Sequence, residues 1–249
     1  HTTLVEADLQ GATLDEASLR AADLTRARLT KASLCGATLD DAELEEAWLD
    51  GAVLREASLR RVRASHADAS GATFVSAQLA SSVWDRARLD EANFESASLS
   101  DASFRGASLC RADWSNVRAP GVRLSRGANL TALRAPKADL RGATPIGATL
   151  DDAELDEACL LRADFTGASL QKASLAKADL EHACLRAANL NGASLRAAFA
   201  LAACFERADL SKADCTGATL FQADFFEATV QDTNLAKAMI DGTRLQKDR

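Results

Sequence analysis

A large apolar side chain, nearly always Leu or Phe, recurs at every fifth position of this 249-residue chain, and Ala nearly always precedes it by two residues. The segment 7–11, with the sequence ADLQG, shows the unit, which continues almost without interruption from Leu4 to Leu245. A helix requires apolar residues three and four positions apart and a strand requires them two apart, so neither element sustains a strict spacing of five. The internal repeat therefore decides the fold before any local prediction of helices or strands.

The repeat changes register once. If the apolar centre of each unit is called position i, the centres run from Leu4 to Leu124 in 25 units and, after one additional residue near Gly127, from Leu130 to Leu245 in 24. A chain that turns after every few extended residues can direct i and i−2 inward and leave i−1, i+1 and i+2 to solvent. Small Ala at i−2 then lets each corner approach the axis, while Leu or Phe at i fills the middle.

This pattern resembles the pentapeptide-repeat family over essentially the whole chain. The resemblance implies an all-β fold, a right-handed quadrilateral parallel β-helix in which each pentapeptide forms one side and four complete a coil. We therefore expect about 12 coils and a rod roughly 58 Å long, from the usual spacing between neighbouring strands. Residues separated by twenty positions should lie above one another, which converts the sequence into a map of surfaces.

We expect a single domain over residues 1–249, with a distorted coil or small protruding loop around 116–146. Pro120, Pro136 and Pro145 fall in that stretch, and because proline cannot donate to a ladder we predict that strand pairing is interrupted there. The repeat is already in register at Leu4, with no capping segment before it, so we also expect a fragment or a domain of a longer protein.

Aromatic side chains at the centres are predicted to be core residues. The spacing of twenty stacks Phe74, Phe94 and Trp114 in one column, and Phe205 and Phe225 in another. Such ladders indicate packing, so no cofactor role is assigned to them.

The charge balance raises a functional alternative. The net charge is −7, and acidic residues gather at 40–46 and 151–157. Family members that confer fluoroquinolone resistance are acidic rods that imitate DNA and bind DNA gyrase, so the resemblance implies a gyrase-binding DNA mimic as one candidate. B-DNA carries one charge per about 1.7 Å, so a rod of the expected length would need on the order of 34 negative charges to match it.

The spacing of twenty also predicts that the acidic residues are neutralised locally. Asp40 lies between Arg20 and Arg60 and Asp41 precedes Arg61, and the further predicted columns are Arg26, Glu46 and His66, then Lys137, Glu157 and Lys177, and Arg207 with Glu227. Opposite charges on neighbouring strands stabilise one another, which favours balanced, solvated faces over a DNA-like stripe.

Outward apolar residues are the main candidates for a protein interface. They are Phe199, Leu201, Phe221, Phe226 and Met239 near the C-terminal end, and Trp48, which we expect to stack with Arg28. A homodimer contact or a contact with another protein is the favoured hypothesis for the C-terminal group, and cover by the chain's own tail is the alternative.

A second candidate surface is a basic patch near the irregular coil, composed of Arg118, Arg123, Arg126, Arg134 and Lys137, with Arg141 beside it. The patch has few aromatic neighbours in an acidic chain, which argues against direct binding of nucleic acid. It is interpreted as solvated, with docking of an acidic protein as the alternative.

No catalytic, cofactor or metal site is expected. His66 and His182 have no evident nucleophile beside them, no Gly-rich phosphate loop interrupts the repeat, and the six cysteines lack zinc-site spacing. Cys215 should face inward, and Cys35, Cys110, Cys159, Cys184 and Cys204 outward. Cys184 and Cys204 should be stacked within disulfide range, but a cytosolic chain would keep them as free thiols.

We also predict no membrane span and no signal peptide, which favours the bacterial cytoplasm, with secretion by a signal-peptide-independent route as the alternative. The leading functional hypothesis is a non-enzymatic scaffold for protein–protein interaction. The repeats are loosely similar to C-terminal pentapeptide domains of accessory proteins of bacterial secretion systems, including type VI-like ones. The alternative is the gyrase-binding DNA mimic that confers resistance to fluoroquinolones or other topoisomerase poisons.

Overall fold

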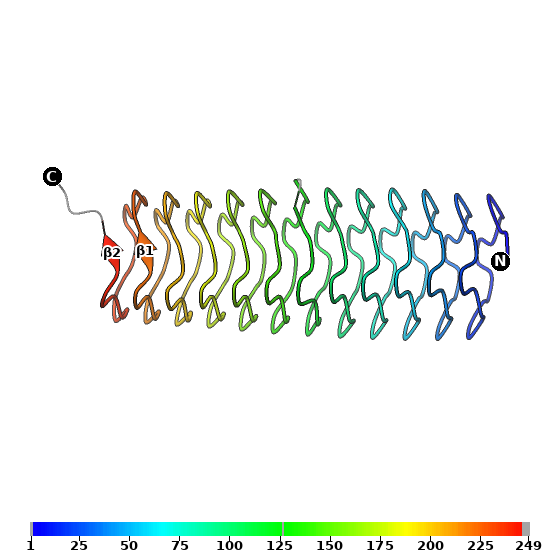
Figure 1. Cartoon of the computed structure of the whole chain (residues 1–249), viewed down its shortest axis with the longest axis horizontal. Helices are drawn as coiled ribbons and strands as arrows, with labels where there is room; N and C mark the ends of the chain where they lie inside the picture. Colours follow the sequence, from blue (N-terminus) through cyan, green and yellow to red (C-terminus); the bar gives the residue numbers. More distant parts are fainter. Residues whose placement is uncertain (1, 126, 246–249) are drawn as a thin grey trace.

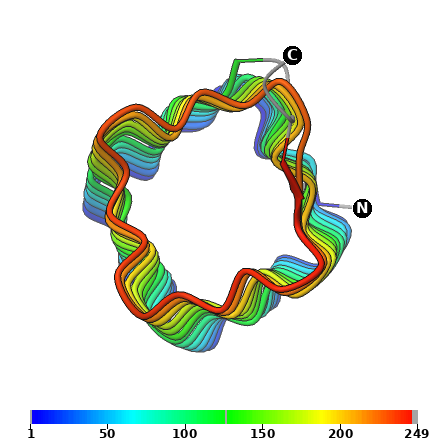
Figure 2. The ribbon, with the colours of Figure 1, turned by 90° about the vertical axis from the view of Figure 1, so that its left-hand side faces the viewer.

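The computed structural model describes residues 2–125 and 127–245, which wind into a right-handed quadrilateral β-helix (Figure 1). Viewed along the axis, successive coils lie in register and outline four sides (Figure 2). At nearly every fifth position a residue pairs in parallel with the residue one coil further along, 20 or 21 positions away, from Thr3 with Asp23 to Thr219 with Met239. Most of these contacts are single bridges, and β1 (Asp224–Phe225) pairs with β2 (Arg244–Leu245) as short strands. The predicted all-β fold is therefore confirmed.

The bridging residues, at position i−1, define four faces. In chain order, face 1 begins at Thr3, face 2 at Asp8, face 3 at Thr13 and face 4 at Ser18. Each face is followed by a corner that is formed by the residues at i+1 and i+2. This naming places every outward side chain on a face or at a corner.

Each corner is a β-turn. The first is closed by a hydrogen bond from the Ala7 N–H to the Leu4 carbonyl at 3.1 Å, and the same bond recurs along the rod. The residue at i+2 has a positive φ, for example 58° at Glu6 and 69° at Gly242, as the third residue of a type II turn does. Left-handed backbone is unfavourable for residues with a Cβ atom, but the Glu6 N–H there donates to the Thr25 carbonyl of the next coil at 2.9 Å. Pairing between coils therefore fixes the turn conformation even where glycine is absent.

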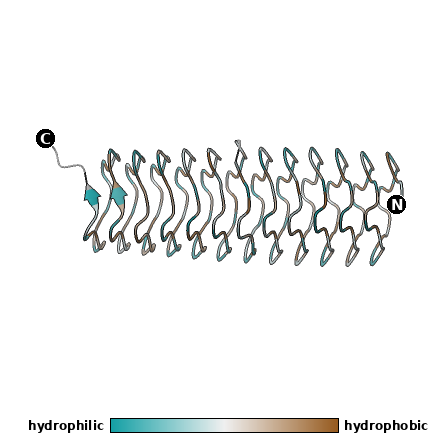
Figure 3. Ribbon diagram, viewed as in Figure 1, coloured by the Kyte–Doolittle hydropathy of each residue, from teal (hydrophilic) through white to brown (hydrophobic). Residues whose placement is uncertain are grey.

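The core is a continuous axial stack. The residues at i and i−2 are buried from Ala22 to Phe225, and Figure 3 shows hydrophobic and hydrophilic residues alternating along the coils. Phe74 stacks on Phe94 with ring centres 4.7 Å apart, and Phe205 stacks on Phe225 at 4.9 Å. The predicted aromatic columns are confirmed at these positions.

The two buried indoles differ in their hydrogen bonds. Trp84 donates from Nε1 to the Ser82 hydroxyl at 3.1 Å, and that hydroxyl donates to the Leu79 carbonyl at 2.7 Å. Ser82 stands at i−2, where Ala is usual. Trp114 has Ala112 at the corresponding position, and its Nε1 is buried without a partner. The same local arrangement thus occurs twice, once with a hydrogen-bonded indole N–H at Trp84 and once with an unpaired indole N–H at Trp114.

A single corner absorbs the change of register. Ser108 pairs with Asn129, 21 residues further on, whereas Asn129 pairs with Thr149, 20 residues further on. Between these pairs, Arg118 with Asp139 and Arg123 with Thr144 also pair at a separation of 21, so pairing continues through the irregular stretch.

The prediction that the three prolines generally interrupt strand pairing is wrong. Pro120 and Pro136 are the second residues of their turns, where the fixed φ of proline is favourable and no N–H is needed. Pro145 stands at a centre and has no N–H to donate to the next coil, although the Asp164 N–H still donates to the Ala143 carbonyl at 2.9 Å. The interruption is therefore confined to one rung, the bridge expected between Thr144 and Asp164.

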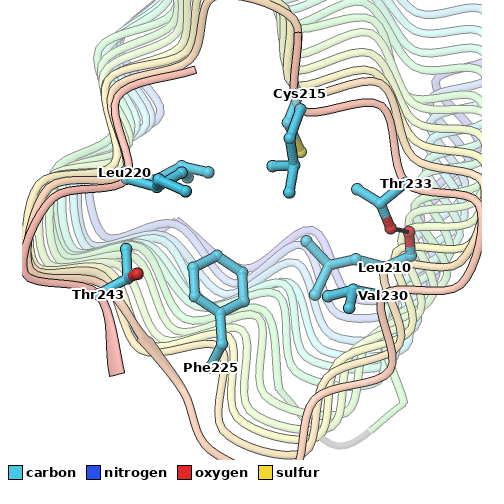
Figure 4. Close-up of a pocket in the computed structure, with 9 residues that line it drawn as sticks. Leu210, Cys215, Leu220, Phe225, Val230, Thr233 and Thr243 are labelled. Carbon is cyan, nitrogen blue, oxygen red and sulfur yellow. Dashed lines mark hydrogen bonds between the residues drawn. The ribbon is translucent and has the colours of Figure 1, made fainter. Parts of the chain in front are cut away.

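The core opens at the C-terminal end of the described coils. Val230, Leu235 and Ile240 occupy centres there and are exposed. Together with Thr233 and Thr243 they surround an apolar hollow above Phe225 and Leu220 (Figure 4). The sequence pattern alone does not distinguish these centres from the buried ones. Their side chains are exposed because no further coil is described above them to cover them.

Candidate protein-docking surfaces

Many aspartates have a structural task at the corners. In the described coils, backbone pairing leaves the N–H at i+1 without a backbone acceptor. One solution uses the i−1 side chain of the same unit, as when Asp23 Oδ1 accepts from the Thr25 N–H at 3.1 Å. Another uses the previous coil, as when Asp40 Oδ1 accepts from the Arg60 N–H at 3.1 Å and the Ser58 hydroxyl at 2.5 Å. Such local acceptors are what aspartate supplies at turns.

The second arrangement accounts for part of both acidic clusters. The aspartates that accept across coils in this way are Asp15, Asp40, Asp85, Asp90, Asp151 and Asp156. Burial opposes ionisation of Asp40, but hydrogen bonds from Ser58, the Arg60 N–H and Arg20 outweigh it and hold its pKa below the ordinary value. These six carboxylates cap turns, so their oxygen atoms are committed to those contacts.

Ion pairs neutralise further acidic residues at the predicted spacing. Arg20 lies 3.0 Å from Asp40, Arg61 lies 2.6 Å from Asp41, and Arg207 lies 2.6 Å from Glu227. Glu157 contacts both Lys137 and Lys177, at 3.9 and 3.5 Å. The pairs of Asp41, Glu157 and Glu227 are exposed and contribute at most about 1 kcal/mol each. They place a positive group beside each of these carboxylates, which breaks up the negative charge of the surface at these positions.

In one predicted column the arginine forms its ion pair with its neighbour on the other side. Arg26 pairs with Glu6 at 3.1 Å rather than with Glu46. Both carboxylates are stacked neighbours of Arg26 in adjacent coils, so the spacing of twenty permits either pair, and the side-chain rotamers decide between them.

An outward apolar cluster lies on face 4 and its following corner. Phe199 and Met239 stand in one bridging column, separated by Thr219, and are 40% and 55% exposed. Leu201 and Phe221 occupy the adjoining corner, where Phe221 is 41% exposed and Leu201 is half-buried. We call Phe199, Leu201, Phe221 and Met239 the apolar patch. These four candidates predicted from the sequence therefore share one surface.

The other two apolar candidates lie elsewhere. Phe226 is half-buried at the corner after face 1, with the Arg244 guanidinium 5.2 Å from its ring centre. Trp48 is exposed on face 2, and Arg28 covers its ring at 5.6 Å, as predicted. Neither side chain extends the apolar patch.

The predicted basic patch does not form one surface. Arg118 lies on face 4, Arg123 on face 1 and Arg134 on face 3. Arg134 contacts Asp113 at 3.0 Å and Glu154 at 3.3 Å.

The remaining members of that patch are also dispersed or neutralised. Lys137 lies at the corner after face 3 beside Glu157, and Arg141 lies 2.7 Å from Asp139. Arg126 lies outside the described residues. The sequence prediction failed because residues close along this chain turn onto different faces after every five positions.

Ile146 is an exposed apolar residue that the sequence analysis missed. It is 40% exposed at the corner after face 1 and follows Pro145. The signal was present, since every i+1 residue points outward, but the unusual proline centre obscured the position of Ile146 within its unit.

Potential metal ligands and thiol groups are a further feature of the described residues. Within residues 2–125 and 127–245 no three His, Cys, Asp or Glu side chains are grouped so that they could hold a metal ion. Cys215 is buried in the core, and burial raises the pKa of its thiol to about 12. None of the described residues belongs to a helix long and apolar enough to cross a bilayer.

Comparison with known proteins identifies the family. The model described as pentapeptide repeats matches in 8 copies, and the matched segments include residues 4–41, 39–75, 74–109, 87–126, 158–196, 188–226 and 203–238. No curated protein is similar enough to this chain to count as a relative.

Three solved structures illustrate what the chain is similar to. HetL, a pentapeptide repeat protein involved in regulation of heterocyst differentiation in the cyanobacterium Nostoc sp. strain PCC 7120, is 32% identical, with 92% of this chain and 90% of HetL covered and a TM-score of 0.38. A pentapeptide repeat protein from the Arabidopsis thaliana thylakoid lumen is 27% identical, with 41% and 71% covered and a TM-score of 0.34. QnrB1, a plasmid-mediated fluoroquinolone resistance protein, is 21% identical, with 84% and 90% covered and a TM-score of 0.30. The family model, which matches more than half of the residues, shows that this chain belongs to the pentapeptide-repeat family.

Proposed function

We propose that this chain is a non-enzymatic scaffold that binds another protein through the apolar patch. The observation that supports the proposal is the clustering of Phe199, Leu201, Phe221 and Met239 over neighbouring coils of one face and corner. Most other outward positions are polar or small, and contiguous exposed apolar side chains mark interaction sites. Between Ala22 and Phe225, the described core is filled by Leu, Phe and Ala side chains and leaves no interior cleft for a substrate.

A substitution within the patch tests the proposal. Phe221→Asp places a charge at the centre of the patch, and Ile146→Asp is the matched control, because both residues stand at i+1 with nearly equal exposure, 41% and 40%. Burying the exposed part of a phenylalanine contributes about 1–2 kcal/mol, so its loss should weaken association about 5- to 30-fold.

The assay combines light scattering for oligomeric mass with quantitative pull-down of binding proteins. We expect Phe221→Asp to reduce self-association or partner capture and Ile146→Asp to leave both unchanged. If both variants matched the wild type in both measurements, the patch would not be an interface.

For the biological process, the first hypothesis is a role as an accessory or effector component of a bacterial, type VI-like secretion system, and its support is the loose sequence similarity described above. Partners recovered with the wild type and lost with Phe221→Asp would identify the process directly. Recovery of partners unrelated to secretion would contradict this hypothesis.

Gyrase binding is the competing hypothesis. The capping contacts of aspartates such as Asp40 and Asp151, together with the ion pairs, favour a balanced surface over a continuous DNA-like one. We therefore expect the protein neither to inhibit gyrase supercoiling nor to protect gyrase from a fluoroquinolone. Either effect at low micromolar protein would reverse the ranking of the two hypotheses.

A further inference from the structure

Two thiols are direct ladder partners on face 1. Cys184 pairs in parallel with Cys204, so the two side chains leave neighbouring coils side by side. The spacing of paired strands puts their Cα atoms about 4.8 Å apart, inside the range of roughly 4.4–6.8 Å that disulfides adopt. Both residues are half-buried and free, so a small reagent can reach the sulfur atoms. We propose that Cys184 and Cys204 form a reactive dithiol that a low-molecular-weight disulfide converts reversibly into an intrachain disulfide.

The other outward cysteines lack such a partner among the described residues. Cys159 is half-buried in the same way, but its ladder partners are Asp139 and Asp179. Cys35 and Cys110 stand at corners, and their N–H groups donate to Asp15 and Asp90 of the preceding coils. Cys159 is therefore a matched single thiol that lies one face away from the dithiol.

The surroundings of the two cysteines affect the ionisation of the Cys204 thiol and the contacts of the Cys184 sulfur. Burial raises the pKa of the Cys204 thiol, and the neighbouring Cys184 adds to this effect while Arg186 opposes it. The Cys184 sulfur lies 3.3 Å from the Thr166 hydroxyl, which itself donates to Asp164. Ionisation of Cys204 is thus disfavoured by its partner, whereas a disulfide removes both ionisable groups at once.

The exchange is balanced in atoms and electrons. One cysteine thiolate attacks a sulfur of the reagent, breaks the reagent's S–S bond and releases its first thiol. The second cysteine then attacks the mixed disulfide, forms the intrachain S–S bond and releases the second thiol. The two protein thiols lose two electrons, the reagent's disulfide gains them, and the two protons pass to the released thiolates.

The geometry also accounts for reversibility. Stacked partners in a parallel ladder keep their Cβ atoms near the strand spacing, which exceeds the mean Cβ separation of about 3.8 Å in relaxed disulfides. A strained disulfide is more easily reduced than a relaxed structural one. The bond should therefore open again in excess thiol instead of remaining as a permanent cross-link.

Peptide mapping after redox equilibration tests the proposal. The folded protein is incubated in buffers of reduced and oxidised glutathione, quenched with acid and alkylated before it is unfolded. Trypsin cleavage places Cys184 in peptide 178–186, Cys204 in peptide 197–207 and Cys159 in peptide 142–162. We expect the linked pair of the first two peptides to exceed the glutathione adducts on them at least tenfold, and to disappear after addition of dithiothreitol.

Three variants make the result specific. Cys184→Ser and Cys204→Ser should each abolish the linked pair and leave the remaining thiol with a glutathione adduct. Cys159→Ser should leave the yield of the linked pair unchanged. Separate adducts on the two peptides without a link, or no reaction at either cysteine under conditions that modify Cys159, would overturn the proposal. A bond that excess dithiothreitol does not open would overturn its reversibility.

Discussion

The two buried tryptophans allow a reciprocal test of how much a hydrogen bond to a buried indole N–H stabilises this core. Ser82→Ala removes the hydroxyl that lies 3.1 Å from Trp84 Nε1 and leaves that indole N–H buried without an acceptor. Such a loss costs about 1–3 kcal/mol. Ala112→Ser introduces the same hydroxyl two residues before Trp114, whose Nε1 has no partner at present. The gain from one net hydrogen bond is about 0.5–1.5 kcal/mol.

The local backbone is equivalent at the two sites, which makes the comparison sound. The Ser82 N–H donates to the Leu79 carbonyl at 3.1 Å, and the Ala112 N–H donates to the Leu109 carbonyl at 3.0 Å. A hydroxyl at position 112 can therefore donate to its own turn carbonyl and accept from the indole, as it does at Ser82. Ala107→Ser is the control, since its unit has Leu109 at the centre and offers no indole.

The assay is guanidinium unfolding followed by circular dichroism, together with exchange of the indole N–H protons measured by NMR. The exchange measurement is needed because a solenoid can unfold in parts, so a single transition does not report each coil. Ser82→Ala should accelerate exchange at Trp84, and Ala112→Ser should slow it at Trp114. The reasoning would be refuted if Ala112→Ser destabilised the protein as much as Ala107→Ser does.

Two further predictions concern pH and backbone conformation. Hydrogen bonds from the Thr216 hydroxyl, and then from Arg196, lower the pKa of Asp214 to about 2. A carboxyl with a depressed pKa stabilises the fold above its unfolded-state pKa of about 4 and loses that contribution as the pH falls towards 2, so the melting temperature should drop in that window and drop less in Asp214→Ala. A drop of equal size in both proteins would contradict this. Ala197→Gly should stabilise by about 1 kcal/mol in chemical denaturation because φ is 52° there, whereas Gly217→Ala, in the same corner column with φ of 68°, should destabilise by a similar amount. Two changes of the same sign would be incompatible with the turn geometry.

The architecture follows from the sequence because the period of five and the spacing of twenty are strict. The stacking of Phe74 on Phe94, the pairing of Arg20 with Asp40 and the exposure of Phe221 all follow from counting residues. The change of register also falls where the extra residue occurs, since Asn129 is the first bridging residue beyond that corner.

Details that depend on side-chain conformation were not predictable in this way. The choice of Glu6 over Glu46 by Arg26 depends on rotamers that the column rule does not fix. To predict that aspartate caps the i+1 N–H, one must know which N–H groups of the turn lack a backbone acceptor. The period of the apolar residues does not contain this information. The dispersal of Arg118 and Arg134 shows that proximity along the chain misleads when each pentapeptide turns onto a new face.

A crystal structure that resolves side chains would test the central claim most directly, namely that each outward residue lies on its partner one coil away. It should show Ser108 opposite Asn129, Asn129 opposite Thr149, and the side chains of Leu201 and Phe221 adjacent on the outside of the rod. A shift of register at any other corner, or a Phe221 side chain inside the core, would contradict the account and remove the apolar patch with it.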